Sequence, residues 1–284
     1  MVFLDALVFD AGVRVAVSVL VTAVLAWEDH QTSFMNERIL YAFAGLGLAW
    51  NFLFLGWNAF LWALAVAIVI GVVGFVSYKA GQFGGGDVLL LLGLALWLPV
   101  SPLVSVPMFW PFVVSVFLVA SFLATVGSGL WYAHTLFKQG RFPGTKKVWW
   151  WLAVAALMAV GVLLPASLTV KFLFLAMGFP ATFYVLYRSD VLSYAVIQEV
   201  SFKELLDEDV LALERMPEKD VEKFGLERVL TASAKSKLKK FMAARKRTRI
   251  PVYKNLPRFG PYLLAGLMLS LLVGDAAWFL LTAA

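Results

Sequence analysis

Residues 58–78, NAFLWALAVAIVIGVVGFVSY, contain no charged side chain from end to end. An apolar run of about 20 residues is long enough to cross the hydrocarbon core of a bilayer as an α-helix. The whole chain is 62% hydrophobic, well above what is usual in soluble domains. The sequence therefore predicts an all-α membrane protein with most of its length in lipid.

Seven further apolar segments flank this stretch, so that about eight transmembrane helices are expected. They are residues 8–28, 39–56, 87–106, 109–137, 148–164, 166–187 and 259–282. The fourth segment contains Pro99 and Pro102 and is expected to be short, because proline interrupts a helix. The first segment is expected to stay in the membrane, because the residues before it lack the basic region of a signal peptide.

Lys and Arg predict the orientation of these helices. Arg38, Lys79 and a basic group within 138–147 fall in alternate connections, and residues 188–258 hold sixteen of the 24 basic residues. Cytoplasmic loops carry the excess of basic residues in membrane proteins. We therefore expect a multi-pass protein of the cell membrane, with these connections in the cytoplasm and both termini outside.

Residues 188–258 form the one long polar stretch and divide the chain into three parts. Residues 1–187 are expected to be membrane helices, 188–258 a small cytoplasmic α+β domain, and 259–284 a C-terminal membrane helix. The basic stretch 235–249 carries eight positive charges and no acid. We expect it to lie on anionic lipid headgroups rather than on nucleic acid; an ordinary solvated surface is the alternative.

Two aspartates stand at predicted membrane boundaries. The stretch 81–93, GQFGGGDVLLLLG, places Asp87 between glycines and an apolar run, where a charge is costly unless it has a use. Asp29 ends the first segment, and the predicted topology puts both at the cytoplasmic boundary. Packing of the first and fourth helices would bring the two carboxyl groups together.

Two adjacent carboxyl groups can hydrolyse a peptide bond. Like charges held close cannot both ionise easily, so one group keeps its proton. The ionised group then activates a water molecule, and the protonated group donates to the developing oxyanion. The glycines before Asp87 would let a substrate backbone approach closely. The alternative interpretation is that Asp87 only caps the N-terminus of a helix.

Gly84-Gly85-Gly86-Asp87 resembles the Gly-x-Gly-Asp signature of membrane aspartyl proteases. Together with WEDHQTSFMNERI around Asp29, it is similar to the type IV prepilin peptidases and archaeal preflagellin peptidases. In that family the first aspartate leaves the first helix of the protease core and the second opens the fourth. The ending IPVYKNLPRFGPYLLAGLMLSLLVGD resembles the close of the archaeal members, and the absence of cysteine favours that type.

The resemblance implies a catalytic pair, Asp29 and Asp87, and an active-site loop of Gly84, Gly85 and Gly86. The substrate would be a prepilin or preflagellin precursor with a short basic leader, cut at the cytoplasmic face just before its hydrophobic helix. The product would be a subunit of a type IV pilus or archaellum. No metal or organic cofactor is implied, because water is the nucleophile.

Three residues near Asp29 are candidates for binding substrate: Glu28 and Glu37, as an acidic rim for the basic leader, and Asn36. A solvated loop is the alternative. Two departures from the family pattern stand out. Met35 replaces the usual Pro, and Leu89 stands where the family often has Lys.

Two other functions remain open on the residues alone. One is a presenilin-like or signal-peptide-peptidase-like intramembrane protease, for which 165–168 (PASL) is the nearest approach to a third motif. The other is a transporter of protons or cations that uses helix-terminal aspartates. We expect the acidic and basic residues of two pairs, Asp10 with Arg14 and Lys171 with Asp275, to be structural.

Overall fold

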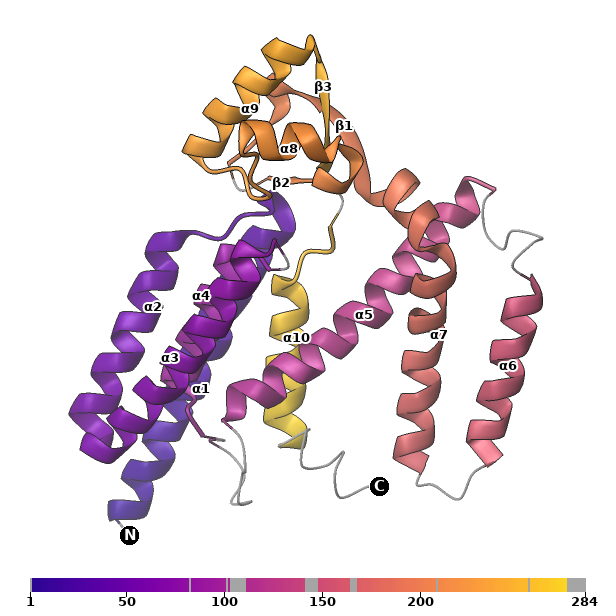
Figure 1. Ribbon diagram of the computed structural model, residues 1–284. Helices are drawn as coiled ribbons and strands as arrows, with labels where there is room; N and C mark the ends of the chain where they lie inside the picture. Colours follow the sequence, from indigo (N-terminus) through magenta and orange to yellow (C-terminus); the bar gives the residue numbers. More distant parts are fainter. Residues whose placement is uncertain are drawn as a thin grey trace.

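The computed structural model describes residues 2–81, 83–100, 102, 111–140, 148–163, 168–207, 209–254 and 256–274. Figure 1 shows a bundle of helices with a small sheet-containing part at one end. The apolar helices are α1 (Val2–Thr32), α2 (Glu37–Trp50), α3 (Trp57–Lys79), α4 (Gly85–Trp97), α5 (Phe112–Lys138), α6 (Val148–Leu163), α7 (Leu168–Asp190) and α10 (Gly260–Val273). Each of the eight apolar segments thus contains a helix.

Four stretches of helix among the described residues are long and apolar enough to cross a membrane: Phe9–Thr32, Glu37–Leu55, Trp57–Lys79 and Phe112–Lys138. The chain is therefore a membrane protein. Helices α4 and α10 have only 13 and 14 residues, a length of about 20 Å at 1.5 Å per residue. That is less than the thickness of a bilayer core, so eight full spans stay a prediction. The fourth segment ends earlier than predicted because the helix stops at Trp97, before Pro99.

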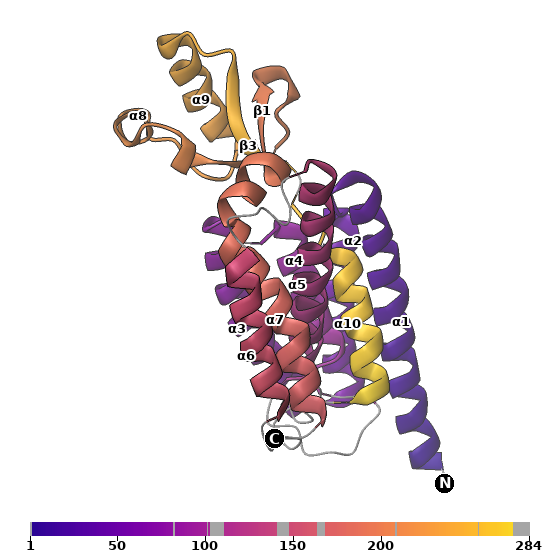
Figure 2. The same ribbon diagram turned by 90° about the vertical axis from the view of Figure 1, so that its right-hand side faces the viewer.

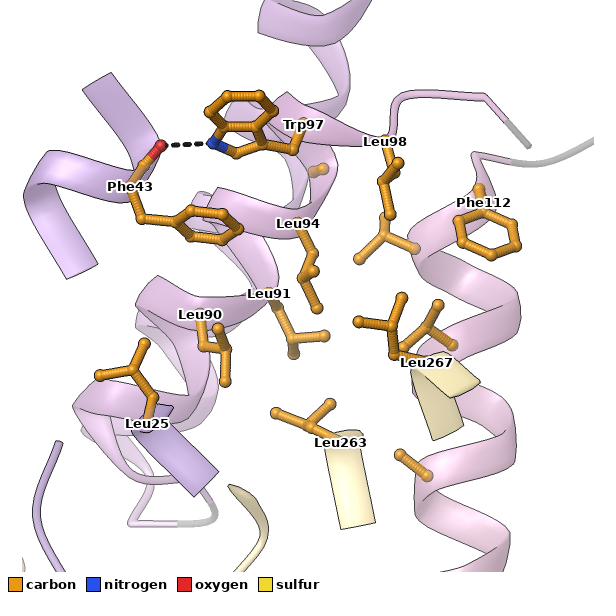
Figure 3. Packing of buried hydrophobic residues seen from close by; sticks show 14 of the residues in the cluster. Leu25, Phe43, Leu90, Leu91, Leu94, Trp97, Leu98, Phe112, Leu263 and Leu267 are labelled. Atoms are coloured by element: carbon orange, nitrogen blue, oxygen red, sulfur yellow. Dashed lines mark hydrogen bonds between the residues drawn. The ribbon is translucent and has the colours of Figure 1, made fainter. Parts of the chain in front are cut away.

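Helices α1 and α10 pack side by side. Helix α10 lies between α1 and α5, and α4 packs on α2 and α3. Helix α5 crosses the bundle obliquely and separates it from α6 and α7 (Figures 1 and 2). The shared core is built from leucines of α1, α4 and α10 with aromatic residues of α2 and α5, as Figure 3 shows: Leu25, Leu90, Leu94, Leu263, Leu267, Phe43 and Phe112.

Buried polar side chains anchor the C-terminal end of α4. The last carbonyl groups of a helix lack partners, which is costly in lipid. The Arg14 guanidinium donates to the Trp97 carbonyl oxygen at 2.7 Å, and the Asn51 amide donates to another carbonyl of the same turn. Asp10 lies 3.7 Å from Arg14 and accepts from the Trp50 indole at 2.6 Å. The predicted pairing of Asp10 with Arg14 is thus confirmed. Asp275, the expected partner of Lys171, lies outside the described residues.

The polar segment between α7 and α10 contains the predicted small sheet. Strands β1 (Ile197–Ser201), β2 (Val210–Leu211) and β3 (Arg249–Tyr253) pair antiparallel in the order β1-β3-β2. Helices α8 (Glu218–Phe224) and α9 (Ala232–Arg245) complete this part, which we call the insert, residues 197–254. Helix α7 and the π-helix Val191–Val196 after it continue to the start of β1, so the insert begins later than residue 188.

The basic stretch 235–249 uses its apolar side chains within the insert itself. Leu238, Phe241 and Met242 of α9 are buried in the core of the insert. Three of its charges form ion pairs: Lys235 with Asp207, Lys237 with Glu227, and Arg245 with Asp220. Because the apolar face is already buried, a contact between this stretch and anionic lipid would depend on charge alone.

Candidate active site

Asp29 lies near the end of α1, and only 8% of its surface is exposed. Its Oδ2 atom accepts a hydrogen bond of 3.0 Å from the backbone N–H of Gly260, the first residue of α10. The first N–H groups of a helix have no partner within the helix and attract negative charge. The start of α10 therefore binds the carboxylate at the end of α1.

Gly260 is a site residue that the sequence did not identify. A Cβ atom at this position would lie 2.8 Å from Asp29 Oδ2 and 2.9 Å from Met35 Cε. Since real Cβ atoms do not come that close, glycine is required here unless the neighbours shift. The available signal was the Gly-Pro pair at the start of an apolar segment, because proline is favoured in the first turn of a helix.

Asp87 is the third residue of α4, and Gly84 is the residue that caps the helix. The Asp87 carboxylate accepts a hydrogen bond from the Gly84 backbone N–H. An acidic side chain at the third helical position commonly reaches back in this way. The interpretation of Asp87 as the capping residue is therefore wrong, because the cap is Gly84, three residues earlier. Its place at a helix N-terminus is as expected.

The two aspartates line one groove of about 540 Å³. Its walls come from the turn between α1 and α2, from α2 and α3, and from the glycine loop 84–86 that opens α4. The two carboxyl groups are close enough to interact electrostatically. The structure thus brings together two carboxyl groups that are far apart in the sequence. The guanidinium of Arg258 also acts on Asp29 electrostatically.

Met35 lies between the start of α4, which carries Asp87, and the start of α10, which contacts Asp29. A Cβ atom at Gly86 would be 3.2 Å from the Cβ of Met35, and the far end of the same side chain faces Gly260. The thioether therefore packs between the starts of α4 and α10. Leu89, which stands where the family often has Lys, also lines the groove. Position 89 therefore places an apolar side chain at the groove instead of an ammonium group.

The other predicted site residues divide into two groups. Glu28 accepts a hydrogen bond of 2.8 Å from the Asn36 backbone, and the Asn36 side chain accepts one of 3.0 Å from the Arg38 backbone. Asn36 is the residue that caps α2. Glu28 and Asn36 therefore hold the turn that leads into α2, whereas Glu37 lines the groove.

The insert contributes residues that sequence reasoning did not place at the site. Asp207 also lines the groove. Arg228 donates from Nη1 to the Ala80 carbonyl oxygen at 3.4 Å, and its side chain packs against Gly81. The insert therefore touches the connection between α3 and α4, which leads into the glycine loop before Asp87.

A second, apolar cavity of about 260 Å³ adjoins the groove. Residues of α3, α4 and α5 line it, among them Val73, Val88 and Phe117. Val88, the residue that follows Asp87, lines both the groove and this cavity. In the described part of the chain, no group of three or more His, Asp or Glu side chains is arranged to hold a metal ion.

Residues 16–129 match the family model described as the Type IV leader peptidase family. The matched segment runs from α1 into α5 and includes Asp29, the glycine loop and Asp87, while the insert and α10 lie beyond it. No curated protein and no solved structure matches the chain. The match supports a membrane-bound protease that acts on a precursor protein. The helical core that carries both aspartates is thus similar, over its matched residues, to the type IV leader peptidase family.

Proposed function

We propose that this protein is an aspartic endopeptidase that removes the short basic leader of a prepilin- or preflagellin-type precursor, with Asp29 and Asp87 as the catalytic pair. The main support is that both carboxyl groups line one groove. The mature product would then be free to enter a pilus or archaellum filament.

The pair would act on one water molecule in the groove. The ionised carboxylate takes a proton from the water as the water oxygen bonds to the scissile carbonyl carbon. The protonated partner gives its proton to the carbonyl oxygen, which yields a neutral tetrahedral intermediate. When the C–N bond breaks, the first carboxyl group returns its proton to the leaving amine, and the partner recovers its proton from the new carboxyl group. The two groups titrate as a pair, so neither role is assigned to one residue.

The substrate would use both cavities. The groove accepts the polar leader, and the apolar cavity beside it can receive the first residues of the hydrophobic helix that follows the cut. Val88, which lines both, would then lie beside the scissile bond. This arrangement suits cleavage at the border between a polar and an apolar segment.

We place the cut at the cytoplasmic face. The insert carries most of the basic residues, and it lies at the same end of the bundle as the start of α4 (Figure 1). Helix α1 begins and α10 ends at the opposite end (Figure 1). The excess of Lys and Arg at the catalytic end supports a cytoplasmic position.

The intramembrane alternative has less support. Its third motif would have to be 165–168, and residues 164–167 lie outside the described part of the chain. Helix α7, which begins at Leu168, packs on α5 and α6 (Figure 2). The transporter alternative does not explain why the two aspartates share a groove with the glycine loop.

The test is cleavage of a tagged precursor by the purified full-length protein in lipid vesicles. Asp29→Asn and Asp87→Asn keep the size of the side chain but cannot exchange the proton. We expect each to lower kcat by more than about 100-fold. Glu199→Gln, which removes an exposed carboxylate from β1, is the matched control and should leave cleavage unchanged. Full activity in either aspartate variant would overturn the proposal.

A further inference from the structure

We infer that Asp207 of the insert helps to recognise the cationic leader, and that Lys235 occupies Asp207 when no substrate is bound. This inference rests on the proposed function, because it names what the groove selects. Asp207 lies outside the residues that match the peptidase family, so the family match assigns it no role.

The charge of the groove indicates the chemistry of its ligand. In the part of the chain that the structure describes, its charged lining residues are all carboxylates: Asp29, Glu37, Asp87 and Asp207. A cleft lined by one sign of charge concentrates ligands of the opposite sign. Two of these groups belong to the proposed catalytic pair, which leaves Glu37 and Asp207 to attract a cationic peptide.

These two carboxylates stand at the rim of the groove. Both residues are exposed to solvent, so they can pair with a cation without a large desolvation cost. Glu37 begins α2 and belongs to the membrane bundle, whereas Asp207 reaches the groove from the insert. A leader that enters the groove would therefore pass between the bundle and the insert.

A lysine of the same chain already fills the position that a leader ammonium would take. The Lys235 Nζ atom lies 2.7 Å from Asp207 Oδ1 and also donates to the Leu205 carbonyl oxygen at 3.3 Å. The side chain of Asp207 is nevertheless 77% exposed, so a second cation can approach it. Lys235 would then compete with the substrate for the same carboxylate.

Contacts between the insert and the bundle hold Asp207 at the groove. Arg228 bonds to the Ala80 carbonyl oxygen at the end of α3, and Val210 packs against Gly81. Val210 begins β2, which follows Asp207 closely along the chain. The position of the recognition residue is therefore coupled to the connection that carries the glycine loop.

Recognition and a purely structural ion pair predict opposite results for two variants. If Asp207 binds the leader, Asp207→Asn should raise KM for a basic leader about two- to fivefold, the effect of one exposed charge pair. Lys235→Gln should lower KM by a similar factor, because it frees the carboxylate. Glu199→Gln, which removes an insert carboxylate outside the groove lining, should change nothing. Shifts of KM in the same direction for Asp207→Asn and Lys235→Gln would overturn the inference.

The leader itself provides the second arm of the test. With a leader in which every Lys and Arg is replaced by Gln, Asp207→Asn should lose its effect on KM. Asp207→Lys should cleave the basic leader poorly and recover on a leader with Glu in those positions. An equal effect of Asp207→Asn on basic and neutral leaders would contradict recognition by charge.

A binding measurement separates this inference from the proposed function. In the Asp87→Asn background, the Kd of a synthetic leader peptide can be measured without cleavage. Suppose that binding depends on Asp207 and on leader charge, but Asp29→Asn cleaves fully. The proposed catalytic pair would then be refuted, and the role of Asp207 in recognition would be supported. If cleavage requires Asp29 and Asp87 but binding does not depend on Asp207, the catalytic pair would be supported and recognition by Asp207 refuted.

Discussion

The contact between Gly260 and Asp29 depends on the absence of a side chain at residue 260 as well as on the Asp29 carboxylate. The backbone N–H of Gly260 bonds to the carboxylate, and any Cβ there would press on both Asp29 and Met35. The proposed activity therefore depends on a residue of α10 that cannot itself exchange a proton. Met35 takes the place that proline usually has in the family, and its flexible thioether fills the space between two glycines.

Gly260→Ala should reduce cleavage and leave the fold intact. The methyl group must displace the Asp29 carboxylate or the Met35 side chain, so kcat should fall about 10- to 100-fold, as expected when a reacting group is moved by a fraction of an ångström. Gly45→Ala is the matched control, because a Cβ there would meet nothing within 4 Å. It should cleave normally and melt no lower, since Ala favours a helix over Gly. Normal kcat in Gly260→Ala would show that this contact does not position Asp29.

Helix α4 connects the site to the opposite end of the bundle. Its first turn carries Asp87, and its last turn is held by Arg14 and Asn51. In addition, the Trp97 indole donates to the Phe43 carbonyl oxygen at 2.7 Å, which ties α4 to α2 (Figure 3). A helix of 13 residues cannot satisfy its own ends in lipid, so these polar partners offset the cost of a short helix. They also fix the position of Asp87 along the helix axis.

The apolar cavity formed by α3, α4 and α5 offers a test of where the hydrophobic part of the substrate lies. Val73→Trp fills this cavity and should raise KM for the precursor about tenfold, roughly the loss of one buried aliphatic side chain. Val72→Trp is the matched control, because Val72 is equally exposed, at 60% against 61%, but does not line the cavity. A leader peptide without its hydrophobic helix should bind both variants equally. Equal KM values for the precursor in both variants would remove the cavity from the substrate path.

Much of the architecture could be predicted from the sequence, because apolar runs define membrane helices without long-range information. The place of Asp87 at the start of a helix was visible for the same reason, as was the pairing of Asp10 with Arg14 four residues apart. The early end of α4 was only partly visible, since its capping side chains come from α1 and the π-helix after α2. Gly260 and Asp207 could not be placed at the site, because their contacts join segments that only tertiary packing brings together.

The basic stretch 235–249 shows that an apolar pattern does not identify the surface that covers it. Amphipathicity and positive charge are typical of a helix on a lipid surface. The apolar side chains of α9 complete the core of the insert, so contact with a lipid surface remains a prediction that rests on charge. A periodic pattern predicts that a face is buried but does not say against what.

The orientation of the whole molecule can be tested directly, because the chain has no cysteine. Glu199→Cys places a single thiol on β1 of the insert, and Val100→Cys places one just after α4, at the opposite end of the bundle; both positions are exposed. In intact cells, a maleimide that cannot cross the membrane should label Val100→Cys only, and after permeabilisation it should label both. The distribution of Lys and Arg predicts this result, since the insert, at the end of the bundle that holds the groove, carries most of them. Labelling of Glu199→Cys in intact cells would place the groove outside, where it could not meet a precursor before export. Each variant must also cleave the tagged precursor normally, so that the labelled protein is the folded one.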